Sequence, residues 1–161
     1  MTVEQALECY SIGHSDRPPE ELLALLERYG IDLVVDVRSF PYSTYLPHYD
    51  KHRLDAVLHR RGISYIWMGL MLGSLTLDGR LDPIAKEREK NYQEGISKLM
   101  DLLPGRKVCL LSSEAEWQIS HRHNLIAQTL MRYGIIVRHI DKDGDAVDAP
   151  ADLFHLEDVS N

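Results

Sequence analysis

The stretch Ile-Asp-Leu-Val-Val-Asp-Val fills residues 31–37, between Gly30 and Arg38. A short, mostly apolar run rich in Ile and Val predicts a strand covered on both faces, which is typical of parallel sheets. Before it, Pro18–Tyr29 has apolar residues at helical spacing and prolines in its first turn, and these predict a helix. After it, Lys51–Arg61 predicts a second, shorter helix. A strand between two helices is the repeating unit of an α/β fold.

The rest of the chain continues this alternation. Further strands are predicted at Leu7–Ile12, Ile63–Met68, Lys107–Leu111 and Ile135–Ile140, and further helices at Pro83–Leu103 and Ser120–Tyr133. Five strands alternating with four helices predict one α/β domain over residues 1–161, with a mostly parallel five-stranded sheet between two helical layers. The core would span residues 7–140. The tail at 141–161 is expected to be irregular, with only Leu153–Leu156 able to pack.

Length and composition exclude several classes of protein. The chain has 161 residues, of which 44% are hydrophobic and 27% charged, as expected for one soluble domain. No apolar run reaches the ~18 residues of a membrane span, and Met1–Ser11 lacks the basic start of a signal peptide, so we expect a cytoplasmic protein. Cys9 and Cys109 each lie in an apolar strand, which favours buried free thiols over a disulfide or a nucleophile.

The common cofactor and metal motifs are missing from the sequence. There is no Gly-x-x-x-x-Gly-Lys phosphate loop, no Gly-x-Gly-x-x-Gly fingerprint and no Cys-x-x-Cys. The pair His121-x-His123 is too short to indicate a metal site by itself. We therefore expect neither a cofactor nor a metal.

The net charge of −7 is unevenly distributed. Residues 141–161 carry seven acids against Lys142 alone, whereas residues 38–61 hold five Lys or Arg and only Asp50 and Asp55. One basic segment on a nearly neutral body is compatible with a polyanionic partner such as DNA. A solvated helix face explains the same charges equally simply.

Uncommon residues follow the predicted strands at their carboxyl ends, where ligands bind in open α/β sheets. These segments are 13–16, 38–43, 69–74 and 112–123. In the last of them, Ser120 can cap a helix whose first turn holds His121 and Arg122. Cations are disfavoured there by the helix dipole, so they indicate an anion site, unless they point into solvent or pair with Glu114 or Glu116.

Aromatic residues gather in the segment 40–49, next to the basic one. Phe40, Tyr42, Tyr45 and Tyr49 can stack on nucleobases, at roughly 1–3 kcal/mol per base, or cover the sheet as core residues. Trp67 and Trp117 follow other strands and are expected to line the same cleft. The candidate substrate- and phosphate-binding residues are Ser15, Arg38, Ser39, Phe40, Pro41, Tyr42, Ser43, Lys51, Gly69, Trp117, Ser120, His121 and Arg122.

Two rim acids are candidates for catalysis, together with His14. Asp36 and Arg38 are two residues apart in a strand and share a face, so we expect an ion pair that keeps Asp36 ionised. Glu114 is expected in a loop near His121 and Arg122, where it can reach a sugar or a water. We therefore assign Glu114 as the acid/base residue and Asp36 as its electrostatic partner. His14 is as compatible with a hydrogen-bonding loop residue as with a catalyst.

Four motifs together resemble the family named domain of unknown function 488. They are Ile12-Gly13-His14-Ser15, Asp36-Val37-Arg38-Ser39-x-Pro41-x-Ser43, Leu72-Gly73, and Glu114 followed by Ser120-His121-Arg122. The resemblance covers about residues 9–140 and implies a Rossmann-like three-layer fold. The family typically has Cys where this chain has Ser112 and Ser120, and Gly where it has Ser74. A cysteine-nucleophile or sulfur-transfer mechanism therefore does not carry over to these positions.

Some relatives in that family are associated with DNA-glycosylase activity on oxidised or modified cytosine. The resemblance thus implies excision of such a pyrimidine from DNA, and a stacking loop beside a basic segment fits it. Two alternatives stay open: a phosphate-handling enzyme on free nucleotides or sugar phosphates, and a non-enzymatic nucleic-acid-binding module. An associated lyase step needs an amine, for which Lys51 is the lysine closest in sequence to a rim loop.

Overall fold

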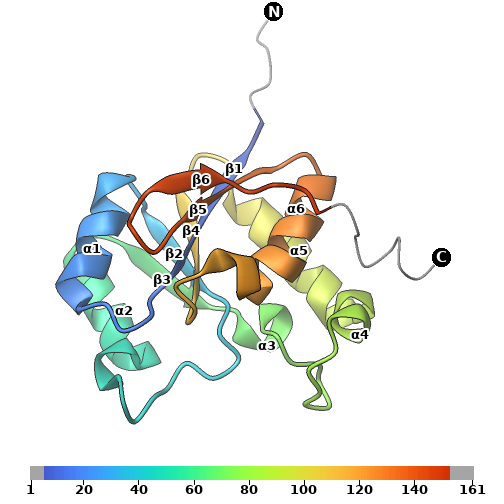
Figure 1. Ribbon diagram of the computed structural model, residues 1–161, viewed down its shortest axis with the longest axis horizontal. Helices are drawn as coiled ribbons and strands as arrows, with labels where there is room; N and C mark the ends of the chain where they lie inside the picture. Colours follow the sequence, from blue (N-terminus) through green and yellow to red (C-terminus); the bar gives the residue numbers. More distant parts are fainter. Residues whose placement is uncertain (1–5, 153–161) are drawn as a thin grey trace, which may run out of the picture.

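The computed structural model describes residues 6–152 and contains one six-stranded sheet in the order β3-β2-β4-β1-β5-β6 (Figure 1). The strands are β1 (Glu8–Gly13), β2 (Leu33–Asp36), β3 (Ser64–Trp67), β4 (Val108–Ser112), β5 (Ile136–Ile140) and β6 (Ala146–Asp148). The first five are parallel, which confirms the predicted α/β fold with a mostly parallel sheet. The sixth pairs antiparallel with β5, in a tail expected to be irregular. Leu153–Leu156 lie outside the described residues.

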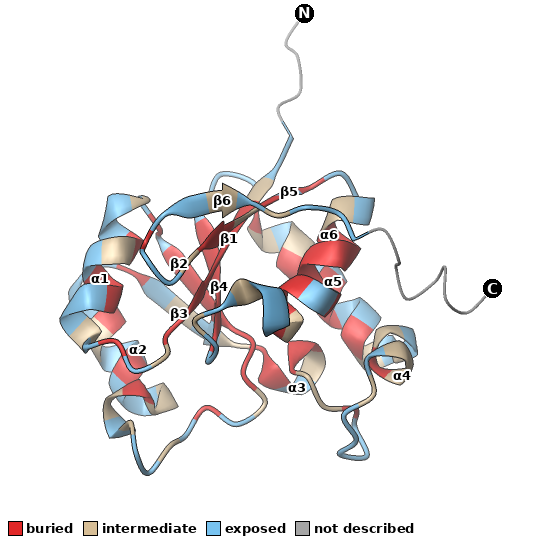
Figure 2. Cartoon of the chain, in the orientation of Figure 1, coloured by how far each residue is buried: buried red, intermediate tan, exposed pale blue. Residues whose placement is uncertain are grey.

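Helices cover both faces of this sheet. They are α1 (Pro19–Arg28), α2 (Lys51–Arg60), α3 (Gly69–Leu72), α4 (Pro83–Arg88), α5 (Lys90–Leu102) and α6 (Gln128–Arg132), with the short helical segments η1 (Pro47–Tyr49), η2 (Trp117–Ile119) and η3 (Arg122–Ala127). One apolar core joins α1 and α2 to the sheet and the other joins α3, α5 and α6 to its opposite face. Figure 2 shows the inner strands β1, β2 and β4 buried between these two layers, whereas the edge strand β6 is exposed or intermediate. In β2, Val34 belongs to the first core and Val35 to the second, as alternation requires.

Two predicted helices differ from the observed ones. The helix expected at Pro83–Leu103 is interrupted at Glu89, whose backbone is extended with φ −64° and ψ 133°. Its carboxylate explains the interruption, because it accepts from the backbone N–H of Leu77 at 2.9 Å and pairs with Lys86 at 3.4 Å. The helix expected at Ser120–Tyr133 begins as the π-helix η3, and its wider turn accompanies the burial of both Arg122 and His123.

The cysteine prediction is confirmed. Cys9 and Cys109 are free and fully buried. They belong to the cores on opposite faces of the sheet. Burial raises the pKa of Cys9 to about 12, so this thiol is inert at neutral pH. Within residues 6–152, no helix is both long and apolar enough to cross a membrane.

Candidate functional site

The candidate site lies where β2, β4 and β1 end side by side. β1 leads into α1 on one face of the sheet, while its neighbour β4 leads into η3 and α6 on the other face. Such a switch point is where open α/β sheets bind ligands. The ladder between these strands continues past their ends, because the N–H groups of His14 and Ser15 donate to the carbonyls of Ser112 and Ser113, both at 2.9 Å. The rim is therefore held rigidly by its backbone.

Asp36 and Arg38 form a buried, two-pronged ion pair, as predicted. Arg38 Nε donates to Asp36 Oδ1 at 2.9 Å and Nη2 donates to Oδ2 at 2.8 Å. The carboxylate also accepts from the Arg38 backbone N–H at 3.1 Å and from the Tyr65 hydroxyl. Each oxygen thus accepts two hydrogen bonds, which fills the capacity of a carboxylate. Asp36 is fully buried and has no position left for a water or a substrate.

His14 extends this network across to β1. Its Nδ1–H donates to the Ser15 carbonyl at 2.7 Å, so Nε2 carries the lone pair that faces Arg38 Nη1 at 3.3 Å. The ring stacks on Tyr49, with 4.4 Å between ring centroids. Burial lowers the pKa of His14, and the Ser15, Asp36 and Glu114 oxygens only partly oppose that shift. A neutral imidazole with both nitrogens engaged within the protein serves to position Arg38.

Glu114 is the exposed carboxylate of this rim. Its Oε2 accepts from the Ser120 hydroxyl at 3.2 Å. The Glu114 backbone touches β1 so closely that a Cβ at Gly13 would lie 1.6 Å from the Glu114 carbonyl oxygen. His121 lies beside it and donates from Nε2 to the Val37 carbonyl at 3.1 Å, and burial lowers the pKa of this histidine. The structure therefore brings Glu114, His14 and His121 together, as the sequence predicted, and gives solvent access to the glutamate.

Arg122 begins the helix η3, as the sequence predicted, but its side chain does not face an anion-binding surface. It is fully buried and does not face solvent at the start of a helix. Its Nε and Nη1 donate to Ser112 and Ser11, each at 2.8 Å, and Nη2 donates to the carbonyls of Glu114 and Ala115. The guanidinium therefore holds the loop after β4, and the expected contact of Arg122 with a bound anion is wrong for this conformation. Ser120 is also fully buried and contacts Ser112 at 3.2 Å.

The aromatic segment divides into exposed and buried rings. Phe40, Tyr42 and Tyr45 are exposed by 75%, 56% and 92%. Tyr49 is buried, and its hydroxyl donates to the Arg17 carbonyl at 2.6 Å. Phe40, Tyr42 and Tyr45 are therefore exposed enough to stack on nucleobases. Tyr49 is instead a core residue, which was the alternative interpretation of this segment.

The remaining polar residues of this segment shape the loop. Ser43 Oγ accepts from the N–H groups of Tyr45 and Leu46, both at 3.2 Å, which is a local turn contact. The Pro41 carbonyl accepts from the Lys51 backbone N–H at 2.8 Å and so fixes the start of α2. Ser15 adopts a positive φ of 49° and its hydroxyl donates to Asp16. These contacts make Ser43, Pro41 and Ser15 structural residues of the rim loops.

The loop after β2 also packs tightly against α3. A Cβ at Gly69 would lie 1.9 Å from the Arg38 carbonyl oxygen, and one at Gly73 would lie 2.2 Å from Ser39 Oγ. Ser39 Oγ is buried without a hydrogen-bond partner among the described residues. Lys51 places its ammonium 4.6 Å from the centre of the Trp67 ring, and Trp67 donates to the Arg38 carbonyl at 2.8 Å. Gly69 and Lys51 therefore lie beside the Asp36–Arg38 pair.

The two tryptophans do not line one cleft, contrary to expectation. Trp67 ends β3 at one edge of the sheet. Trp117 stacks on His139 of β5, with 4.8 Å between ring centroids, and meets His123 edge-on. Three strands separate β3 from β5, which at about 4.8 Å per strand places the rings far apart. Trp117 is therefore not part of the surface around Arg38.

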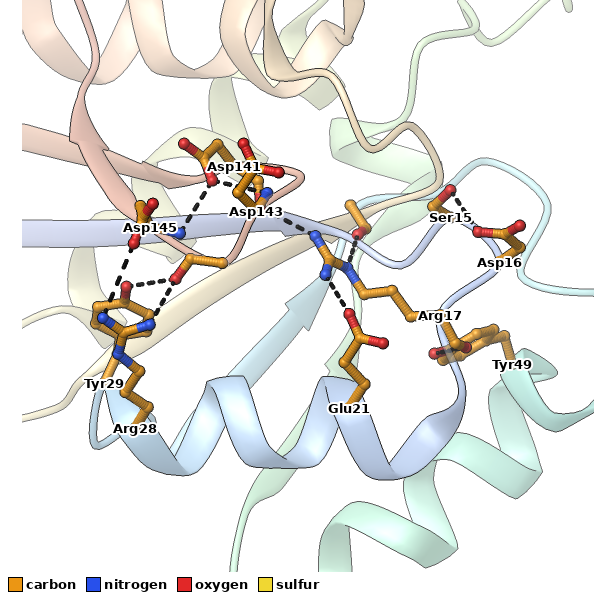
Figure 3. A network of polar contacts seen from close by, with 12 residues as sticks. Ser15, Asp16, Arg17, Glu21, Arg28, Tyr29, Tyr49, Asp141, Asp143 and Asp145 are labelled. Atoms are coloured by element: carbon orange, nitrogen blue, oxygen red, sulfur yellow. Dashed lines mark hydrogen bonds and ion pairs between the residues drawn. The ribbon is translucent and has the colours of Figure 1, made fainter.

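Sequence reasoning missed Arg17 and Tyr65. Arg17 is buried and donates to the carbonyls of Gly13 and Asp141, so it joins the rim loop after β1 to the turn after β5 (Figure 3). Its position just after the segment 13–16 was the available signal. Tyr65 reaches Asp36 because the register aligns it with Val34 on the neighbouring strand. That register is not readable from one sequence. No group of His, Cys, Asp or Glu within residues 6–152 could hold a metal ion.

Comparison with known proteins gives one match. A family model described as Domain of unknown function DUF488 matches residues 18–129, which is more than half of the chain. No curated protein matches the chain. No solved structure matches it either.

Proposed function

Because this chain belongs to the DUF488 family, whose description carries no activity, its own residues must support a function, and we propose that it is a DNA glycosylase. Its substrate class would be a damaged or modified pyrimidine, such as an oxidised cytosine, in DNA. The chain would cleave the N-glycosidic bond that joins this base to deoxyribose.

The observation that carries the proposal is the exposed aromatic loop beside the buried ion pair. Phe40 and Tyr42 follow Arg38 by only a few residues, yet both rings are largely exposed. Large aromatic rings left in solvent indicate a binding surface, and stacking on a flipped base gives such rings a function. A shallow, open hollow is lined by Tyr42 together with Ser43, Thr44, Pro47 and Asp50.

The basic residues next to this loop favour DNA over a free nucleotide. Lys51, His52 and Arg53 open α2, directly after the aromatic loop, and His52 and Arg53 are exposed. Tyr42 lies 6.4 Å from His52, measured between ring centroids, so the aromatic ring lies beside the segment that carries the cations Lys51 and Arg53. Backbone phosphates next to a flipped nucleotide would contact these cations. A mononucleotide would need only one of them.

In the proposed reaction Glu114 accepts a proton from a water molecule. The water oxygen attacks C1′ of the deoxyribose while the C1′–N bond breaks, and the base leaves with the bonding electrons and takes up a proton. Sugar C1′ develops oxocarbenium character in such reactions, and a nearby carboxylate stabilises it. Asp36, saturated by Arg38 and Tyr65, keeps Arg38 in place beside the reacting nucleotide.

A base-release screen tests this function. Duplexes and single strands that each carry one modified pyrimidine are incubated with the protein, and free base and abasic sites are measured. We expect release of a modified cytosine, lost in the Glu114→Gln variant. Release only from free nucleosides or nucleotides would support the phosphate-handling alternative. Salt-sensitive DNA binding without any base release would identify a binding module.

A further inference from the structure

The short helix α3 holds one large apolar side chain in solvent beside the rim. Leu70 is 63% exposed and is the one exposed residue of this helix. Its neighbours all serve the core, since Gly69 and Leu72 are buried and Met71 packs against the core on this face of the sheet. The fold therefore does not use the Leu70 side chain for its own packing.

Close packing fixes α3 against the rim on one side and against α5 on the other. The glycine at each end of α3 leaves no room for a Cβ, because Arg38 and Ser39 lie directly against them. Figure 1 shows α3 next to the loop that leads out of β2. On the other side, a Cβ at Gly95 of α5 would lie 2.7 Å from Met71 Cβ. Interiors packed this closely do not yield, so α3 keeps one position relative to Arg38.

Polar groups also hold the backbone of Leu70 itself. Its carbonyl oxygen accepts from Lys86 Nζ at 3.2 Å and from the side-chain amide of Asn91 at 3.1 Å. Lys86 is fully buried and pairs with Glu89 at 3.4 Å. Burial lowers the pKa of Lys86, and the Glu89 carboxylate opposes that shift. A buried ammonium group costs free energy, and here it stabilises the backbone that carries an exposed side chain.

The segment that touches α3 continues into the exposed aromatic loop. Phe40 follows Ser39 directly and points largely into solvent. A cation lies nearby as well, because Lys51 lies over the Trp67 ring and a Cβ at Gly69 would lie 2.3 Å from Trp67 Nε1. A rigidly held apolar side chain, exposed aromatic rings and a cation thus gather where β2 and β3 end.

We propose that Leu70 is a wedge that enters duplex DNA when the target nucleotide is extruded, an inference that rests on the proposed function. Extrusion of a nucleotide opens the base stack, and proteins that unstack a duplex insert apolar side chains such as Leu between base steps. A wedge that is already fixed loses little conformational freedom on binding. Phe40 and Tyr42 receive the extruded base while Leu70 fills the space that it leaves. The substrate is therefore duplex DNA, since a single strand has no such space to fill.

A duplex that already contains an open site tests the wedge without requiring base release. It carries one tetrahydrofuran residue, a stable abasic-site analogue, and its affinity is compared with those of the intact duplex and of the single strand. Wild-type protein should bind the abasic duplex more tightly than the intact one, because no base has to be unstacked before Leu70 enters. Equal affinity of the wild-type protein for the two duplexes overturns the proposal.

Leu70→Ala should weaken binding to the abasic duplex by roughly tenfold, as expected when a Leu side chain is no longer buried, and should leave single-strand affinity unchanged. Leu70→Met keeps an apolar side chain of similar size and should bind like the wild-type protein. Leu7→Ala is the control, because Leu7 lies just before β1, at the end of the strand opposite to the rim. Thermal unfolding verifies that each variant is folded. Wild-type affinity of Leu70→Ala for the abasic duplex overturns the wedge.

The same variants separate the wedge from the proposed function. If the wild-type protein releases a base, Leu70→Ala should lower kcat/KM on duplexes and leave it unchanged on single strands. Unchanged release from duplexes overturns the wedge, and the glycosylase proposal then stands without it. If the wild-type protein releases no base but prefers the abasic duplex through Leu70, the glycosylase proposal fails and the wedge stands. A wild-type protein that binds neither duplex contradicts both.

Discussion

At the residue scale, the two rim acids have opposite surroundings. Asp36 is fully buried and accepts four hydrogen bonds. Glu114 is exposed, and one of its oxygens accepts a hydrogen bond from the Ser120 hydroxyl. A carboxylate that must accept a proton from water needs a free lone pair and access to solvent. This contrast supports the assignment of Glu114 as the base and of Asp36 as an electrostatic residue.

Glu114→Gln should lower base release by about 10²- to 10⁴-fold, which is the usual contribution of general acid–base catalysis. The amide keeps the size of the side chain and can still accept from Ser120, so DNA affinity should stay the same. Glu116→Gln is the matched control, since Glu116 is an exposed neighbour that forms a surface ion pair with Lys142. Single-turnover rates and affinities report the two effects separately. Full activity in Glu114→Gln together with an inactive Asp36→Asn would reverse the two assignments.

Arg122→Lys should destabilise the protein by about 2–5 kcal/mol, because lysine cannot satisfy four oxygens arranged around a planar fork and leaves them unpaired. Arg138→Lys is the control, as Arg138 is only partly buried and forms ordinary surface ion pairs with Glu8 and Asp148. That change should shift stability by less than about 1 kcal/mol. Urea unfolding followed by circular dichroism measures both. Similar stability of the two variants would show that Arg122 is not the structural cation described here.

At the scale of elements, the sequence predicted the individual strands and helices better than the interruptions within helices and the contacts between strands. Apolar runs identified the parallel strands, most clearly β1, β2 and β4, because both faces of these three are buried. The apolar pattern could not detect the interruption at Glu89, which depends on a hydrogen bond to Leu77 twelve residues away in the chain. The same limit applies to the site: the Asp36–Arg38 pair follows from local spacing, whereas the contacts of Tyr65 and Arg122 depend on strand order and register.

Two tyrosines of the aromatic segment should respond differently to truncation. Tyr42→Ala should change stability by no more than about 0.5 kcal/mol, because the ring is exposed. It should weaken DNA binding by roughly 1–3 kcal/mol if the ring stacks on a base. Tyr49→Ala should destabilise the fold by about 3–5 kcal/mol, since it removes a buried ring. Thermal unfolding and a DNA-binding titration, run on both variants, distinguish these roles. Unchanged DNA binding by Tyr42→Ala would argue against the stacking surface.

At the scale of the whole molecule, buried neutral histidines make stability depend on pH. Burial lowers the pKa of His14 and His121, and it lowers that of His139 to about 3, against roughly 6.5 in an unfolded chain. Below pH 6.5 the unfolded state therefore binds more protons than the folded state, and stability falls as the pH falls. Above pH 7.5 these groups contribute no further change.

Urea unfolding between pH 7.5 and 5 should show this loss, at up to about 1.4 kcal/mol per pH unit for each histidine. This range lies above the titration of ordinary carboxylates, so the slope reports the histidines. His59→Gln is the control, because His59 is exposed on α2 and should leave the slope unchanged. A flat profile across this range would contradict the neutral state of the buried rings.

The order of the strands has a consequence for folding during synthesis. β1 and β2 are each paired with β4 and not with one another. When the ribosome has made only the first hundred residues, the slot between these two strands is empty, and both carry open hydrogen-bonding edges. The sheet can therefore close only after Val108–Ser112 has left the exit tunnel. Until then the nascent chain has exposed edges that favour aggregation, so we expect it to depend on chaperones during elongation.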